Sequence, residues 1–109
     1  MDSWDLTTLD VEVHKPEVLR SDRGAARAIA INLPAGDALQ DHEVHEHAYV
    51  VCVAGELEIE HNGGVESAGV GYVAHFEPHE RHEVRAKSDS RFLLLLAPWP
   101  NPEDRTTAQ

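Results

Sequence analysis

The sequence predicts an all-β domain, a small antiparallel β-barrel, and three observations support this prediction. Short β-prone segments follow one another at regular spacing, with glycine, proline, asparagine and aspartate between them. Glu56–Glu60 alternates strictly between glutamate and an aliphatic residue, which is the pattern of a strand with one wet face. Asn62, Gly63 and Gly64 follow at once, and these residues adopt positive φ at low cost, so they indicate a hairpin turn.

The other expected strands can be placed in order along the chain. Ala25–Leu33 alternates loosely and ends at a turn over residues 34–36. Tyr49–Val53 is a continuous β-branched run, typical of a strand that is covered on both faces. Three later segments complete the set of seven or eight strands: Tyr72–Phe76, Arg81–Lys87 and Arg91–Ala97. Such a set fits a sandwich or a barrel, and closure of a barrel removes exposed strand edges.

The length bounds the domain organisation. A chain of 109 residues can bury one core and is too short for two. We expect residues 1–99 to form the barrel with an N-terminal extension. Residues 100–109 contain two prolines followed by polar and charged residues, so they are expected to form a flexible C-terminal tail.

The charge and the start of the chain argue against several classes of partner. Nine lysines and arginines against twenty aspartates and glutamates give a formal net charge of −11, which repels nucleic acid and anionic membranes. No window reaches the roughly 18 apolar residues of a membrane span. Residues 1–10 are acidic and show no signal peptide, so a cytoplasmic protein without nucleic acid or membrane partners is expected.

The single cysteine limits the chemistry of a metal site. Cys52 alone excludes an internal disulfide and a zinc site made only of cysteines. Nitrogen or oxygen atoms must therefore supply most of the ligands of any bound metal. We interpret Cys52 itself as a small buried apolar residue, because free cysteine is among the most buried residue types.

Histidines are the most unusual feature of the composition. Seven of the eight fall between positions 42 and 82. One cluster precedes the expected strand Tyr49–Val53 and consists of His42, His45 and His47. The other surrounds Pro78 and consists of His75, His79 and His82. The clusters flank one hairpin, so the segments that carry them can lie side by side, and three or four converging imidazoles would suit Zn, Fe, Ni, Cu or Mn.

Strand parity limits which histidines can act together. His45 and His47 share one face of an extended segment, whereas His42 lies out of phase with both. The three cannot all bind one ion from a straight strand. We interpret His14, His61 and one of the pair His75 and His79 as solvated surface residues.

From Gly36 to His82 the sequence resembles the cupin superfamily. The first cupin motif is glycine, five residues, HxH, three or four residues, glutamate, six residues, glycine, and Gly36, His42 and Gly55 match it. The second motif is glycine, five residues, PxG, two residues, histidine, and Gly71 and His82 match it. The resemblance implies a double-stranded β-helix of the jelly-roll type and association into a homodimer.

The departures from these motifs concern the metal ligands. Val44 and Ala48 stand at the second histidine and the glutamate position of the first motif, and Glu77 and His79 stand where proline and glycine are usual. Two of the four ligands of the family are therefore missing. What the resemblance carries over is His42 and His82, and we expect the nearby residues His45 and His47 to replace the lost ligands.

The family register also creates a conflict at the start of the central strand. It implies that Ala48, Val50 and Cys52 face the barrel interior, which sends His47 outward if the strand is regular. A bulge at the strand start would turn His47 inward. The other resolution is a metal-free cupin in which His42 and His82 line a pocket.

Three functions follow from this sequence. The first is a barrel that binds a divalent transition metal (Fe, Mn, Ni or Zn) and acts on a small organic molecule, in a reaction resembling that of a dioxygenase or isomerase. The second is a non-catalytic module or sensor that binds a small ligand, with or without metal. The third is a cyclase or epimerase that uses histidine acid-base chemistry without metal.

Overall fold

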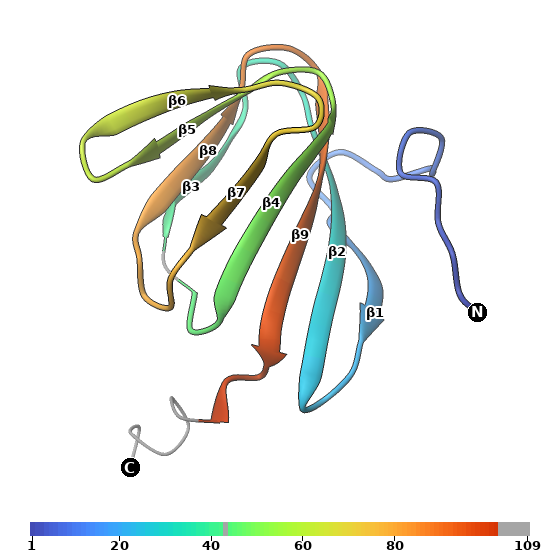
Figure 1. The fold of residues 1–109 in the computed structure, drawn as a ribbon. Coiled ribbons are helices and arrows are strands. Elements are labelled where there is room, and N and C mark those ends of the chain that lie inside the picture. The colour runs from blue at the N-terminus through green and yellow to red at the C-terminus, as the bar shows by residue number, and fades with distance from the viewer. Residues whose placement is uncertain (43, 103–109) are drawn as a thin grey trace.

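The computed structural model describes residues 1–42 and 44–102, apart from the side chains of residues 40–42. The described residues form nine strands in two sheets that face each other (Figure 1). The five-stranded sheet has the order β1 (Glu17–Ser21), β2 (Ala25–Leu33), β9 (Ser90–Trp99), β4 (His47–Ala54) and β7 (Val73–Phe76). The four-stranded sheet has the order β3 (Ala38–His42), β8 (His82–Ala86), β5 (Leu57–His61) and β6 (Gly64–Ala68).

Every strand pair is antiparallel, which confirms the predicted all-β, jelly-roll fold class. The strand Ala25–Leu33 has the predicted bounds. The hairpin is also confirmed, because His61 pairs with Gly64 across a turn in which Asn62 and Gly63 have positive φ. In the part of the chain that the structure describes, no helix is both long and apolar enough to cross a membrane.

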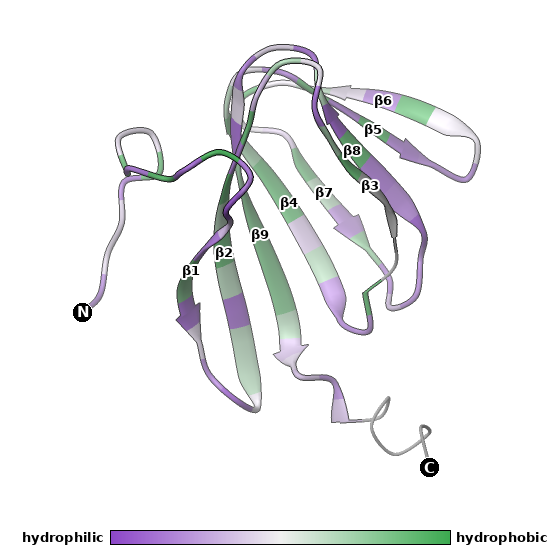
Figure 2. Ribbon diagram, turned by 180° about the vertical axis from the view of Figure 1, so that it is seen from behind, coloured by the Kyte–Doolittle hydropathy of each residue, from purple (hydrophilic) through white to green (hydrophobic). Residues whose placement is uncertain are grey.

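The core lies between the two sheets. Its largest fully buried side chains come from both: Val50, Cys52, Leu57, Ile59, Val84 and Phe92. Strand β9 is hydrophobic along most of its length (Figure 2) and pairs with β2 on one side and β4 on the other. Burial of these side chains is the main favourable term that holds the two sheets together.

One expectation about β4 was wrong. The strand was predicted to be covered on both faces, but its burial alternates and Tyr49 is 36% exposed. The reason is that only the inner face of β4 meets the opposite sheet, while the outer face at Tyr49 meets solvent. Half of the side chains of this strand are therefore available for contacts on the outer surface.

Gly55, between β4 and β5, marks a close approach of two chain segments. Its φ is +78°, and a Cβ built there would overlap the Asp89 carbonyl and the Ser90 backbone. The approach is fixed by a hydrogen bond of 3.1 Å that the Glu56 N–H donates to Ser90 Oγ. Only glycine satisfies both the backbone angle and the space.

Two glycine substitutions separate these effects. Gly63 has the same φ of +78° but nothing within 4 Å of its Cβ position. We expect Gly63→Ala to lower the free energy of unfolding by about 1–2 kcal/mol through the backbone angle. Gly55→Ala should cost a further ~1–3 kcal/mol through steric overlap. Urea denaturation of both variants measures the difference, and equal losses would show that the close approach at Gly55 is absent in solution.

Candidate metal centre

Strand β4 sends alternate side chains to opposite sides of the five-stranded sheet. Ala48, Val50 and Cys52 are buried between the sheets. Because side chains alternate along a strand, His47 and Tyr49 face outward. The conflict at the strand start is thus resolved as a regular strand, with His47 on the outer face.

Strand β7 brings a second histidine to the same face. It pairs with β4 so that His75 lies opposite Tyr49 and Phe76 lies opposite Ala48. Phe76 is buried with the inward set, whereas His75 is exposed. His47 and His75 are therefore diagonal neighbours on the outer face of two adjacent strands.

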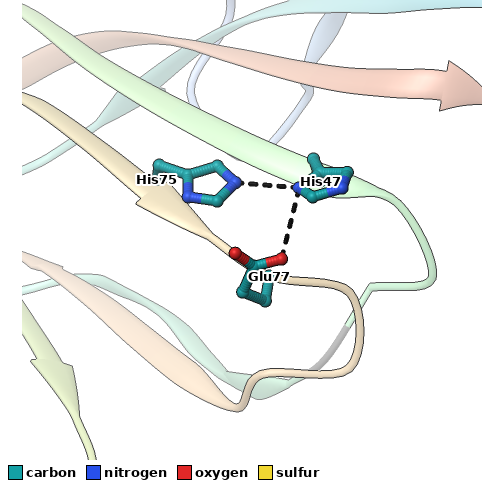
Figure 3. A group of neighbouring side chains, drawn as sticks. All are labelled: His47, His75 and Glu77. Carbon is teal, nitrogen blue, oxygen red and sulfur yellow. Dashed lines mark hydrogen bonds and ion pairs between the residues drawn. The ribbon is translucent and has the colours of Figure 1, made fainter.

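Glu77 completes a group of three possible ligands (Figure 3). His47 Nδ1 lies 2.9 Å from His75 Nε2 and 3.6 Å from Glu77 Oε2. One ligand atom from each residue lies within 4.8 Å of the other two. Within the ranges 1–39 and 44–102, for which side chains are described, this is the one group of three histidine, cysteine or acidic residues with such spacing.

The group combines two imidazoles with one carboxylate on a wet surface. The Glu77 side chain is 68% exposed and the His47 side chain 40% exposed. The two imidazole rings stack, with centroids 5.1 Å apart and planes 19° from parallel. Without an ion the facing nitrogens can share one proton, and an ion that binds both would replace that hydrogen bond. The donor set suits Zn, Fe, Mn or Ni, and three protein ligands leave coordination positions open.

A tight turn fixes Glu77 beside the two histidines. The Glu80 N–H donates to the Glu77 carbonyl at 3.1 Å, and the Glu77 N–H donates to Glu80 Oε1 at 3.0 Å. Pro78 and His79 form the centre of the turn, and His79 has a φ of 70°, as type II turns require at that position. His79 stands where the cupin motif has glycine, and its positive φ explains why glycine is usual there.

The inner histidines form a separate group. His82, on β8, is only 3% exposed, and its ring stacks on Phe76 with centroids 3.9 Å apart and planes 8° from parallel. Its Nδ1–H donates to the Glu80 carbonyl at 3.1 Å. His61, on β5, lies directly opposite His82 and faces the same way.

The structure places the predicted ligands in different surroundings. His47 belongs to the outer group, and His82 lies between the sheets, on the other side of the five-stranded sheet. His45 is exposed, and its ring meets that of His79 edge-on at 5.1 Å. The backbone of His42 pairs with that of His82, but its side chain lies outside the described residues. The ligand set of His42, His45, His47 and His82 therefore stays a prediction.

The residues at the other cupin ligand positions do not supply metal ligands. Val44 is packed against the core and Ala48 is fully buried, and neither has a ligand atom. Phe76 lies flat against His82 and fills the space beside it. Among the described side chains at these positions, only the imidazole of His82 could bind an ion, so they do not fit the metal site of the family.

Neither His75 nor Glu77 belongs to the ligand set expected from the sequence. His75 was one of the two candidates for a solvated histidine, and Glu77 was noted only as a departure from a motif. The available signal was their spacing, because residues i and i+2 in an extended segment share a face. Their partner His47 could not be identified in the same way, because it is 28 residues away in the sequence.

Comparisons with known proteins agree with this architecture. The sequence profile of the family described as "Cupin domain" matches residues 30–98. An RmlC-like cupin from Desulfovibrio desulfuricans is 25% identical, with 90% of this chain and 97% of that chain covered and a TM-score of 0.80. The Cnp3 cupin domain of Schizosaccharomyces pombe is 14% identical, with 93% and 73% covered and a TM-score of 0.78, and this likeness concerns the fold alone. A search of curated proteins finds no relative of the chain.

Cys52 lies on the inner face of β4, away from the candidate metal centre. It is 1% exposed, and its thiol is 3.5 Å from the Ala54 carbonyl. Burial raises the pKa of the thiol, because the thiolate would lose its hydration. The interpretation of Cys52 as a buried apolar residue is thereby confirmed.

We expect Cys52 to resist alkylation in the folded protein. The raised pKa lowers the thiolate fraction at neutral pH, and burial blocks access of the reagent. Iodoacetamide labelling followed by mass spectrometry should give little product in buffer and rapid, complete labelling in denaturant. Equally fast labelling in both conditions would show that the β4 interior is open to solvent.

Proposed function

The chain belongs to the cupin family, and we propose that it binds one divalent transition metal ion through His47, His75 and Glu77. The observation that carries this proposal is the convergence of three ligand atoms within 4.8 Å on the outer face of β4 and β7. The site differs in position from the cupin motif, whose ligands face the barrel interior. It is reached from solvent without any opening of the barrel.

The charge of the protein supports binding of a cation at this surface. A formal net charge of −11 attracts divalent ions over the whole molecule. Glu77 adds a local carboxylate, and the turn from Glu77 to Glu80 holds it in place. Two histidines and one carboxylate are also the ligand types of non-haem Fe(II) oxygenases, which supports Fe beside Zn, Mn and Ni as the bound metal.

A catalytic role on a small organic molecule is the finer part of the proposal. Three protein ligands leave positions open for a substrate or for dioxygen, as in a dioxygenase- or isomerase-like reaction. His75 also lines a cavity of about 240 Å³, which has room for a small molecule. The alternative is a non-catalytic ligand-binding module or sensor, and the 68% exposure of Glu77 favours it, because catalytic sites generally exclude water. Homodimer formation stays a prediction.

Replacing one outer and one inner histidine tests where the metal binds. His75→Ala should weaken Zn binding by about a hundredfold or more, because even outer-shell partners of metal ligands are worth about 10–100-fold. His82→Ala should leave the affinity unchanged, because His82 lies on the other side of the five-stranded sheet. Competition with a chromophoric chelator measures both affinities, and elemental mass spectrometry of protein purified without nickel resin identifies the native metal.

The exposed residue His14 provides the matched control. His14→Ala removes a surface imidazole outside the group and should leave Zn affinity at the wild-type value. Loss of binding in His82→Ala with normal binding in His75→Ala would overturn the outer site. That result would favour an interior ligand set that includes His42 and His82.

A further inference from the structure

A second possible binding site lies at the free edge of β7, the last strand of the five-stranded sheet. A cavity of about 240 Å³ separates this strand from the β5–β6 hairpin. Ile59 and Phe76, both buried, form its apolar walls. His61 and Glu80 are among its polar lining residues. Ligand cavities commonly measure about 300–1,000 Å³, so this one suits a molecule of only a few non-hydrogen atoms.

Two polar groups face each other across this cavity without a hydrogen bond. Among the described residues, the buried atom His61 Nδ1 has no hydrogen-bond partner, while the His61 side chain as a whole is 38% exposed. It lies 3.7 Å from Glu80 Oε2, which is beyond hydrogen-bond distance. The Glu80 carboxylate cannot swing freely toward it, because Oε1 accepts the Glu77 N–H at 3.0 Å. A buried polar atom without a partner is rare in folded proteins, and water or another small molecule between His61 and Glu80 would complete the pair.

The charged residues that line the cavity indicate which kind of molecule it can bind. Glu66 and Glu80 both line the cavity, and its described walls carry no lysine or arginine. Arg81 lines a neighbouring hollow, which it shares with Glu60 and Glu83. An anion would be repelled by two carboxylates, whereas a cation would be attracted. Tyr72 also lines the cavity, and aromatic residues of this kind attract cations.

We propose that this cavity binds a small primary ammonium compound, whose nitrogen bridges His61 Nδ1 and Glu80 Oε2. One nitrogen can lie about 2.9 Å from both atoms, because they are only 3.7 Å apart. An ammonium group has three N–H donors, so it can donate to the carboxylate and, in the tautomer of His61 whose Nδ1 carries the lone pair, to the imidazole as well. An alcohol has one O–H donor and no charge, so it cannot donate to both atoms and lacks the attraction to the carboxylate. The short alkyl part of the molecule packs against Ile59 and Phe76.

This inference does not depend on the proposed metal site. His75 contributes to both the cavity wall and the outer group, and a divalent ion held by His75 would repel an ammonium group nearby. The test is therefore made on full-length protein that has been stripped of metal with chelator. Failure of one proposal then leaves the other unaffected.

The probe is n-butylammonium, with n-butanol as a neutral molecule of the same size. Titration of isotope-labelled protein, followed by NMR, should give saturable shifts at His61, Phe76 and Glu80 for the ammonium probe. Binding of n-butanol should be at least about tenfold weaker, because it lacks the charge-assisted bond. Equal affinities for the two probes, or shifts confined to other surfaces, would overturn the proposal. An absence of saturable shifts with either probe would also overturn it and would mean that water alone bridges His61 and Glu80.

Glu80→Gln tests the role of the carboxylate while preserving the turn. The glutamine carbonyl can still accept the Glu77 N–H, but the charge is lost, so butylammonium affinity should fall by about tenfold to a hundredfold. Glu17→Gln on β1 removes an exposed carboxylate far from the cavity and should leave the affinity unchanged. His61→Phe fills the same space without the nitrogen and should also weaken binding. The dispersion of each spectrum verifies folding, and wild-type affinity in folded Glu80→Gln would overturn the proposal.

Discussion

Side chains along a strand point alternately to its two faces, and in β4 the burial of apolar residues determines which side chains face inward. Ala48, Val50 and Cys52 pack inside the barrel, where Val50 lies opposite Leu94 of β9. A slip of one residue would move this whole set into water and push His47 and Tyr49 into the core. The burial of small apolar side chains therefore holds His47 on the outer surface, and pairing with β7 places its partners there.

The same alternation directs a different set of histidines inward. On β5 and β8 it turns His61 and His82 toward the space between the sheets. Glu80 links the two groups, because its carbonyl accepts the His82 Nδ1–H and its Oε1 accepts the N–H of Glu77. Its other carboxylate oxygen faces His61. One short turn thus positions a candidate metal ligand on the outer face and a polar pair between the sheets, so a change at Glu80 would act on both.

The local features of the fold could be predicted from the sequence, because they depend on neighbouring residues. The strand Ala25–Leu33, the hairpin at residues 62–64 and the inward direction of Val50 follow from alternation, turn chemistry and the cupin motifs. The candidate metal centre could not be predicted, because it depends on the register of β4 with β7. The cupin motif positions indicate His42 and His82 as metal ligands, whereas His75 and Glu77 lie outside the ligand set of the family.

The apolar residues at the family ligand positions have a physical consequence for the barrel. A buried carboxylate without a metal would lose its hydration and receive no compensating charge, so glutamate at position 48 would be unfavourable in a barrel that holds no ion there. Ala48 with Phe76 opposite it fills the same space with apolar atoms. The interior at this point can then contribute to stability as a packed core. The proposed ion site on the outer face of the same two strands consists of side chains that the core does not need, so changes at His47 or His75 should alter metal affinity with little effect on folding.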